Sequence, residues 1–231
     1  MLISPYHARC RARTSRLIAL CEAKRTKPRE NVVQILKDRI RAEGLYLGDG
    51  ILKIDSILNH QMDPNLIKQM GEEIAVRFRD THPTRILTAE VSGIAPALMA
   101  ALALNVPIVY ARKYKPVTMY GPVFLETAPS HTKGGETNLL VAAEYLPPGE
   151  RVLIVDDFLA SGKTLLSLAR MVEQAHCTLV GVATVVEKSF EEGRARLQEK
   201  YNVPVESLAI ITYLDEQRID FADDLPLDLG I

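Results

Sequence analysis

Residues 152–165 read VLIVDDFLASGKTL, and this stretch decides the fold. Its first four apolar residues predict a buried strand. Asp156 and Asp157 follow, and a loop of small residues then leads into a helical pattern near residues 162–175. Paired carboxylates at the end of a buried strand are costly unless a ligand or partner is present. The order of strand, acid pair, loop and helix therefore predicts a binding site.

The tetrapeptide Ser-Gly-Lys-Thr at residues 161–164 also ends the P-loop of many nucleotide hydrolases. That pattern needs a glycine five places before the glycine of Gly-Lys-Thr. Asp157 occupies this position, so the sequence excludes a P-loop and disfavours an ATPase or GTPase.

The loop and the acid pair suit two parts of one ligand. Backbone N–H groups and hydroxyls of residues 161–164 can surround a phosphate at the start of the helix, whose dipole favours an anion by ~0.3–1 kcal/mol. Carboxylates such as Asp156 and Asp157 accept hydrogen bonds from hydroxyls or bind Mg²⁺. A ribose 5-phosphate carries a phosphate beside a vicinal diol and satisfies both halves of the motif.

Strands and helices alternate around this motif. Strands are predicted at 85–90, 106–111, 151–157, 179–187 and 205–212, with helices near 95–104, 162–175 and 190–200. Nearly continuous Val, Ile and Leu strands predict a mostly parallel sheet with helices on both faces. In such α/β folds, ligands bind beyond the carboxyl ends of the strands.

The flanking segments carry other signals. Residues 33–43 predict an amphipathic helix closed by Gly44, and residues 51–57 alternate like a half-buried strand. Asp63 and Pro64 predict a capped helix start, with the helix running to about residue 79. Residues 112–138, which hold several lysines and glycines, predict a long loop that is either disordered or a functional lid.

Composition narrows the class of protein. The chain has 231 residues, of which 47% are hydrophobic and 25% charged, and its longest apolar region, residues 94–111, predicts a buried helix and strand instead of a membrane span. Three cysteines without a C-x-x-C pair suit a reducing cytosol and argue against a disulfide framework or zinc site. We therefore predict a cytoplasmic protein.

The N-terminal residues differ in charge from the rest of the chain. Residues 1–30 hold eight Lys or Arg and two Glu, which leaves 20 basic and 27 acidic residues elsewhere. Because acidic residues outnumber basic ones after residue 30, this part of the chain is a poor general binder of nucleic acid. The basic extension, taken as residues 1–32, permits four readings: a flexible tail, a transit-type segment, a nucleic-acid arm, or translated sequence upstream of the true start. We favour a disordered tail or a start-site artefact, and predict a single domain over residues 33–231.

The motif at 152–165 resembles the binding motif for 5-phosphoribosyl 1-diphosphate (PRPP) in type I phosphoribosyltransferases. The resemblance implies that Asp156 and Asp157 act at the catalytic centre. It also implies that the diphosphate lies between the loop after the strand at 85–90 and the two basic residues after the strand at 106–111. The implied PRPP-binding residues are Ala160, Ser161, Gly162, Lys163 and Thr164, with Ser92, Gly93, Arg112 and Lys113.

The base is indicated by a lysine near the end of another strand. Lys188 would lie at the ligand edge, with Phe190 close by. An ammonium only donates hydrogen bonds, so it suits the 6-oxo group of a purine and disfavours the exocyclic amine of adenine. Taken alone, Lys188 could equally be a solvated lysine, and Phe190 a core residue.

From residue 33 to about residue 212, the chain closely resembles the xanthine phosphoribosyltransferases of bacterial purine salvage. That family implies a type I phosphoribosyltransferase fold with a small N-terminal hood and a long flexible loop, a homodimer, and Mg²⁺ bound with PRPP and diphosphate. Leu52 and Asn59 would then line the xanthine pocket with Lys188 and Phe190, and Asn59 would read the 2-oxo group. No dedicated metal ligands, nucleic-acid partner or membrane contact are predicted.

The resemblance implies a pentosyltransferase, a kind of glycosyltransferase, that forms xanthosine 5′-monophosphate (XMP) from PRPP and xanthine. Ala160 stands where hypoxanthine-guanine enzymes carry a third acid, so the general base is undefined. The family also begins near Val33, which suggests a GTG start codon there. Two alternatives stay open: an enzyme that prefers guanine, hypoxanthine or adenine, and a purine-operon regulator that senses PRPP without turnover.

Overall fold

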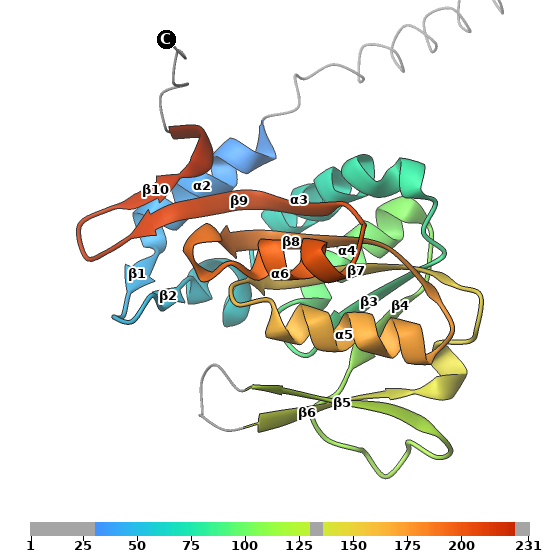
Figure 1. Ribbon diagram of the computed structural model, residues 1–231. Helices are drawn as coiled ribbons and strands as arrows, with labels where there is room; N and C mark the ends of the chain where they lie inside the picture. Colours follow the sequence, from blue (N-terminus) through green and yellow to red (C-terminus); the bar gives the residue numbers. More distant parts are fainter. Residues whose placement is uncertain (1–30, 130–135, 225–231) are drawn as a thin grey trace, which may run out of the picture. The chain divides into compact units, whose positions relative to one another are not determined.

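The structure is a computed structural model that describes residues 31–129 and 136–224 (Figure 1). The chain divides into two units, Met1–Val32 and Val33–Ile231. Apart from residues 31 and 32, all described residues belong to the second unit. Two predictions lie outside the described residues: the basic extension over 1–30, and the part of the predicted loop over 130–135.

A six-stranded sheet forms the centre of the second unit, in the order β10-β9-β8-β7-β3-β4. The strands β3 (Arg85–Ala89), β4 (Ile108–Ala111), β7 (Arg151–Leu159), β8 (Thr178–Lys188) and β9 (Val205–Leu214) run parallel. The edge strand β10 (Ile219–Phe221) pairs antiparallel with β9. The five strands predicted between residues 85 and 212 and the mostly parallel sheet are confirmed.

Helices cover both faces of this sheet. In Figure 1, α5 (Lys163–Gln174) and α6 (Gly193–Lys200) lie in front of it, and α3 (Pro64–Phe78) and α4 (Ile94–Leu104) lie behind it. The chain crosses from β3 to β4 in one direction along the sheet, and from β7 to β8 in the other. The direction therefore reverses between the neighbours β3 and β7, and such a switch point is where open parallel sheets bind ligands.

The helix boundaries follow local signals. Asp63 caps α3 as predicted, because its side chain accepts hydrogen bonds from the backbone N–H groups of Asn65 at 3.0 Å and Leu66 at 3.2 Å. The predicted helix at 33–43 is α2 (Val32–Glu43). The predicted helix at 190–200 starts later, at residue 193, because Glu192 adopts a left-handed backbone with φ of 60° and Ser189–Glu191 form a 3-10 turn.

The longest apolar region forms α4 and β4, a helix and a strand as predicted. The sequence predicted a buried helix, but α4 is buried on one side only. Leu98 and Leu102 expose 46% and 71% of their surface, while Ala97, Ala100 and Ala101 are buried. The small alanines pack inward and the larger leucines face outward. In the described part of the chain, no helix is both long and apolar enough to cross a membrane.

The predicted strand over residues 51–57 is wrong beyond its first residues. β2 (Leu52–Lys53) pairs antiparallel with β1 (Leu45–Tyr46), and a short π-helix then covers Asp55–Asn59. Ile54, Ile57 and Leu58 are fully buried. Their spacing of three and four residues puts them on one side of a helical turn, and their burial overrides the local alternation. We define residues 44–62 as the N-terminal hood.

The predicted loop over residues 112–138 is largely a β-hairpin. β5 (Val123–Pro129) and β6 (Glu136–Ala142) pair antiparallel in a separate sheet, so only residues 113–122 of the described segment form neither helix nor strand. Leu139 and Val141 are buried in one hydrophobic cluster with Leu165 and Leu168 of α5. The hairpin therefore has an apolar face that packs against α5. This packing stabilises two strands in a segment whose glycines and lysines suggested an irregular loop.

Residues after β9 fold back onto α2. Phe221 is fully buried, and the cationic groups of Lys37 and Arg41 lie 5.6 and 4.7 Å from the centre of its ring. The same cations pair with Asp223 and Asp224, respectively. The described end of the chain is therefore attached to the first helix of the unit through an apolar contact and two ion pairs.

Candidate active site

A cavity of about 920 Å³ opens at the carboxyl ends of β7 and β8. It lies between the N-terminal hood, the loop after β3 and the start of α5, so the structure brings together predicted residues from four parts of the sequence. The predicted residues that line it are Leu52, Asn59, Ser92, Asp156, Asp157, Ala160, Gly162, Lys163, Thr164, Lys188 and Phe190.

The acid pair lies on a strand that continues beyond it. The sequence places Asp156 and Asp157 at the end of a strand, but β7 runs on to Leu159 because Phe158 and Leu159 still pair with β8. Burial raises the pKa of Asp156 well above its ordinary value, and the charge of Asp157 raises it further. Burial also raises the pKa of Asp157. Without a ligand, burial therefore shifts both carboxyl groups toward the protonated form.

The loop between β7 and α5 has the geometry of an anion site. Gly162 has φ of 76°, a left-handed backbone that glycine adopts readily, and α5 begins at Lys163 directly after it. The hydroxyl oxygen of Ser161 is buried and has no hydrogen-bond partner in the described residues. Ser161 does not line the cavity wall, but its unpaired hydroxyl and the free N–H groups at the start of α5 suit a phosphate.

The loop after β3 lies directly against the acid pair. A Cβ atom on Gly93 would stand 2.2 Å from the Asp156 Oδ1 and 2.5 Å from the Thr88 hydroxyl oxygen. The Thr88 hydroxyl is buried and unpartnered among the described residues. The peptide bond between Glu90 and Val91 is cis. Gly93 therefore permits the loop after β3 to lie within contact distance of Asp156 on strand β7.

The structure does not bring Arg112 and Lys113 into the cavity wall. The backbone of Arg112 pairs with Leu140 of the hairpin, and its Nε is buried without a partner in the described part of the chain. The backbone N–H of Lys113 donates to the Glu90 carboxylate at 2.7 Å, which ties it to the loop after β3. The Lys113 charge also acts to lower the pKa of Asp156, against the larger effect of burial. Both basic residues thus lie at the border of the site.

The end of β8 meets the N-terminal hood. Lys188 donates a hydrogen bond from Nζ to the Gly50 carbonyl oxygen at 3.0 Å. Phe190 is 44% exposed, so it is not the core residue that the alternative reading supposed, and its ring faces Gly50. Leu52 is buried and Asn59 exposed at the cavity wall. Lys188 is likewise not a solvated lysine, because only 12% of its side chain is exposed.

Sequence reasoning missed several wall residues. Asp49, Gly50 and Ile51 belong to the hood, and the sequence Gly-Asp-Gly at 48–50 is a turn signal that marks them. Glu191 also lines the cavity and pairs with Lys188. Its signal is its position three residues after Lys188, because residues three apart are adjacent in a 3-10 turn. Phe158 and Leu165 complete the wall.

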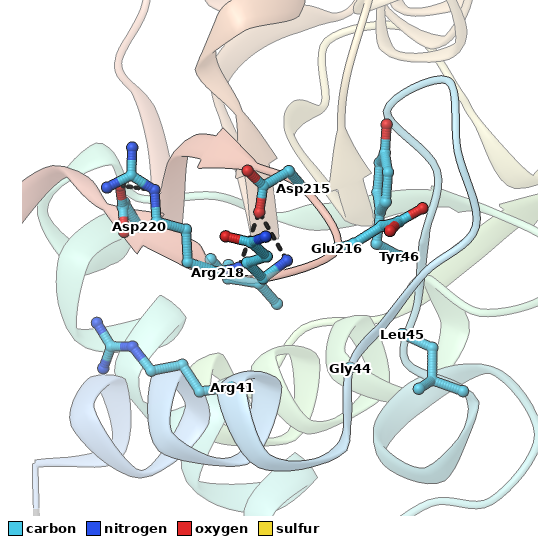
Figure 2. Close-up of a pocket in the computed structure, with 10 residues that line it drawn as sticks. Arg41, Gly44, Leu45, Tyr46, Asp215, Glu216, Arg218 and Asp220 are labelled. Carbon is cyan, nitrogen blue, oxygen red and sulfur yellow. Dashed lines mark hydrogen bonds and ion pairs between the residues drawn. The ribbon is translucent and has the colours of Figure 1, made fainter.

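A second cavity, of about 500 Å³, lies between α2, β1 and the β9–β10 turn (Figure 2). Its arginine and aspartate side chains already have protein partners, among them the pair Arg218 and Asp220. Arg41 pairs with Asp38 and Asp224, and Asp215 accepts hydrogen bonds from the backbone of the β9–β10 turn. None of the predicted site residues lines it. We assign no role to this cavity.

A buried acid pair, a glycine-containing loop at a helix start and a switch point in a parallel sheet agree with the resemblance of the sequence to phosphoribosyltransferases. The family model for the phosphoribosyl transferase domain matches residues 53–225. Among solved structures, the fold is similar to adenine phosphoribosyltransferase from Trypanosoma brucei, with a TM-score of 0.64 and 21% identity over 79% of this chain and 82% of that one.

Curated relatives narrow the family. A xanthine phosphoribosyltransferase from Deinococcus deserti is 51% identical over 80% of this chain and 95% of its own length. One from Moorella thermoacetica is 47% identical over 83% of this chain and 97% of its own length. The chain belongs to the xanthine phosphoribosyltransferase family, within the phosphoribosyl transferase domain enzymes.

Proposed function

We propose that this chain transfers the 5-phosphoribosyl group of PRPP to N9 of xanthine in purine salvage, giving XMP and diphosphate. The bond from ribose C1 to the diphosphate oxygen breaks, and a bond from C1 to N9 forms. One observation carries the proposal: a single cavity joins the buried acid pair, the loop at the start of α5 and the lysine at the end of β8. Identities of 51% and 47% to xanthine phosphoribosyltransferases support the choice of xanthine.

The acid pair and the loop after it would hold the ribose 5-phosphate. Asp156 and Asp157 accept hydrogen bonds from the ribose hydroxyls and stabilise positive charge that develops at C1. Residues 160–164 surround the 5-phosphate with backbone N–H groups and with the hydroxyls of Ser161 and Thr164. The unpartnered Ser161 hydroxyl supports this role because a buried donor without a partner is costly.

The leaving diphosphate would lie between the loop after β3 and the end of β4. Ser92 and Gly93 present the loop, and Arg112 and Lys113 balance the charge. The buried Arg112 Nε, which has no partner in the described residues, supports a bound anion there. The lid predicted over residues 112–138 is restricted by the hairpin, so any movement that excludes water is proposed for residues 113–122 alone.

The base would lie between the hood and the end of β8. Lys188 donates to the 6-oxo oxygen, Phe190 and Leu52 contact the purine faces or edges, and Asn59 reads the 2-oxo group. A hydrogen bond to a charged group contributes about 1.5–3 kcal/mol. Because no carboxylate stands at Ala160, proton removal from the base is assigned to no residue.

Mg²⁺ would bind with PRPP and diphosphate. The described residues contain no group of three or more His, Cys, Asp or Glu that could hold a metal ion alone. Mg²⁺ commonly binds through one or two carboxylates together with substrate phosphates, and the Asp156–Asp157 pair fits such a shared site. When bound, the cation would neutralise charge on the leaving diphosphate.

We also propose that the protein is a cytoplasmic homodimer whose catalytic domain is residues 33–231. The exposed leucines of α4, Leu98 and Leu102, support burial against a second copy.

Residues 1–32 are proposed to be dispensable, with Val33 near the natural start. Sedimentation equilibrium tests the dimer, and an intact N-terminal mass from the native source tests the start: a natural chain that begins at Met1 would rule out the start at Val33.

The experiment that tests the proposed reaction is product identification. The full chain is incubated with Mg²⁺, PRPP and xanthine, and the nucleotide is identified by mass and by its N9 linkage in NMR spectra. We expect XMP and an equal amount of diphosphate. The nearer rival, a phosphoribosyltransferase for guanine, hypoxanthine or adenine, would give its own nucleotide in parallel assays. Tight PRPP binding with no nucleotide from any base would favour the PRPP-sensing regulator.

A further inference from the structure

The cavity contains an ion pair at the position proposed for the base. The Oε1 of Glu191 lies 2.5 Å from Nζ of Lys188, and both residues line the cavity. Only 12% of the Lys188 side chain and 29% of the Glu191 side chain are exposed. Lys188 also donates to the Gly50 carbonyl oxygen. The pair therefore presents a hydrogen-bond donor and an acceptor side by side, held between the 3-10 turn and the hood.

A 6-oxopurine carries the complementary arrangement. Its 6-oxo oxygen accepts, and the adjacent N1–H donates. An ammonium has three donors, so Lys188 retains one after its contacts with Gly50 and Glu191. A carboxylate has about four lone-pair sites, so Glu191 can accept from N1–H while it pairs with Lys188. Adenine reverses the order, because its amine donates and its N1 accepts.

We propose that Glu191 is a specificity-determining residue that accepts a hydrogen bond from N1–H of the purine while Lys188 donates to the 6-oxo oxygen. The inference rests on the proposed function and deepens it. Adenine would place a donor against the ammonium and an acceptor against the carboxylate, so both contacts would be lost. Guanine and hypoxanthine share the oxo and N1–H pattern, so the pair selects 6-oxopurines as a class and leaves Asn59 to distinguish xanthine.

A simpler role for Glu191 is to hold Lys188 in place. The two roles differ for a substrate without N1–H, such as 1-methylxanthine, which keeps the 6-oxo group. If Glu191 only positions Lys188, its removal weakens turnover of both substrates by the same factor. If Glu191 accepts from N1–H, its removal harms xanthine more, and the preference for xanthine over 1-methylxanthine declines.

The test compares kcat/KM for xanthine and 1-methylxanthine in the wild type, Glu191→Ala and Glu191→Gln. We expect Glu191→Ala to lower kcat/KM for xanthine about 10- to 100-fold, the range of a hydrogen bond to a charged group, and to lower the xanthine preference by a similar factor. Glu191→Gln, which keeps size and one acceptor oxygen, should show a smaller loss in the same direction.

The neighbouring Glu192→Gln is the matched control, because Glu192 has a 73% exposed side chain, pairs with Arg196 and does not line the cavity. It should leave both constants unchanged. An unchanged substrate preference in Glu191→Ala, or equal effects in Glu191→Gln and Glu192→Gln, would overturn the inference. Absence of xanthine turnover in the wild type would instead overturn the proposed function.

Discussion

Gly93 and Asp156 are in such close contact that a Cβ atom at residue 93 would stand 2.2 Å from the Asp156 Oδ1. The loop after β3 thus contacts a carboxylate of strand β7 that lies more than sixty residues later in the sequence. We expect Gly93→Ala to displace Asp156 or the loop and to lower kcat/KM for PRPP by about 100-fold or more, since misplacement by about 1 Å costs that much.

Steady-state kinetics with varied PRPP measure this effect. Gly149→Ala is the control, because a Cβ there meets no atom within 4 Å although its φ of 89° also disfavours alanine. It should reduce stability by about 1 kcal/mol and leave turnover intact. Equal turnover in Gly93→Ala and the wild type would contradict the contact.

The buried acid pair predicts a pH-dependent gain of stability in Asp156→Asn. The pKa of Asp156 is raised in the folded protein, chiefly by burial. As pH rises above the ordinary carboxyl range, the unfolded chain releases this proton more easily than the folded one, so the free energy of unfolding falls. Asparagine lacks this proton, and the variant should exceed the wild type by at least ~1 kcal/mol at pH 8, with a smaller difference at pH 5.

Urea denaturation of the ligand-free protein at pH 5, 6, 7 and 8 measures that difference. The same substitution should abolish most turnover, since it removes a carboxylate from the proposed ribose site. A variant less stable than the wild type at pH 8 would show that Asp156 has a stabilising partner when no ligand is bound.

The start of α6 packs against the loop between β7 and α5, which is the proposed site of the 5-phosphate. A Cβ atom on Gly193 would stand 2.2 Å from the Ala160 carbonyl oxygen and 2.7 Å from the Gly162 backbone nitrogen. Arg196 also donates to the Ser161 carbonyl oxygen at 2.9 Å. We expect Gly193→Ala to raise KM for PRPP about 10-fold or more, because the loop must shift away from the 5-phosphate.

We expect Arg196→Ala also to weaken the binding of PRPP, because it removes the hydrogen bond to the Ser161 carbonyl oxygen. Arg151→Ala serves as its control. Arg151 also donates to backbone carbonyl groups, those of Thr81 and His82, but at the opposite end of the sheet. Loss of PRPP affinity in Arg196→Ala alone would support the role of α6. Similar kinetics in both variants and the wild type would show that the loop between β7 and α5 keeps its shape without the Arg196 hydrogen bond.

The attachment of the C-terminal turn to α2 predicts a stability effect without a kinetic one. Lys37 is buried, whereas its partner Asp223 has a 65% exposed side chain. Asp223→Asn should lower the free energy of unfolding by about 1 kcal/mol, because it leaves a buried ammonium with a weaker partner. Thermal unfolding measures the loss, with the exposed Glu216→Gln as control. An unchanged midpoint would show that water replaces Asp223 at no cost.

Much of the core fold could be predicted because its signals are local. Buried strands such as 151–157 are continuous apolar runs, and Asp63 followed by Pro64 is a complete helix-start signal. The acid pair and the loop at 160–164 lie within a few residues of each other, so their shared site follows from the spacing. These parts of the sequence and structure agree.

The remaining features depend on contacts between distant segments. Ile54, Ile57 and Leu58 form a helical turn because all three are buried, which no local alternation reveals. The hairpin at 123–142 requires α5 as its apolar support. The pairing of Lys188 with Glu191 requires a 3-10 turn that the predicted helix did not contain.

The most direct test of the central claim is diphosphate release from Mg²⁺ and PRPP with xanthine, guanine, hypoxanthine and adenine, measured as kcat/KM in the wild type and Lys188→Ala. The account predicts the highest value for xanthine, a very low value for adenine, and a loss of about 10- to 100-fold for xanthine in Lys188→Ala. No release with any base, despite tight binding of PRPP, would contradict the account and indicate a PRPP sensor.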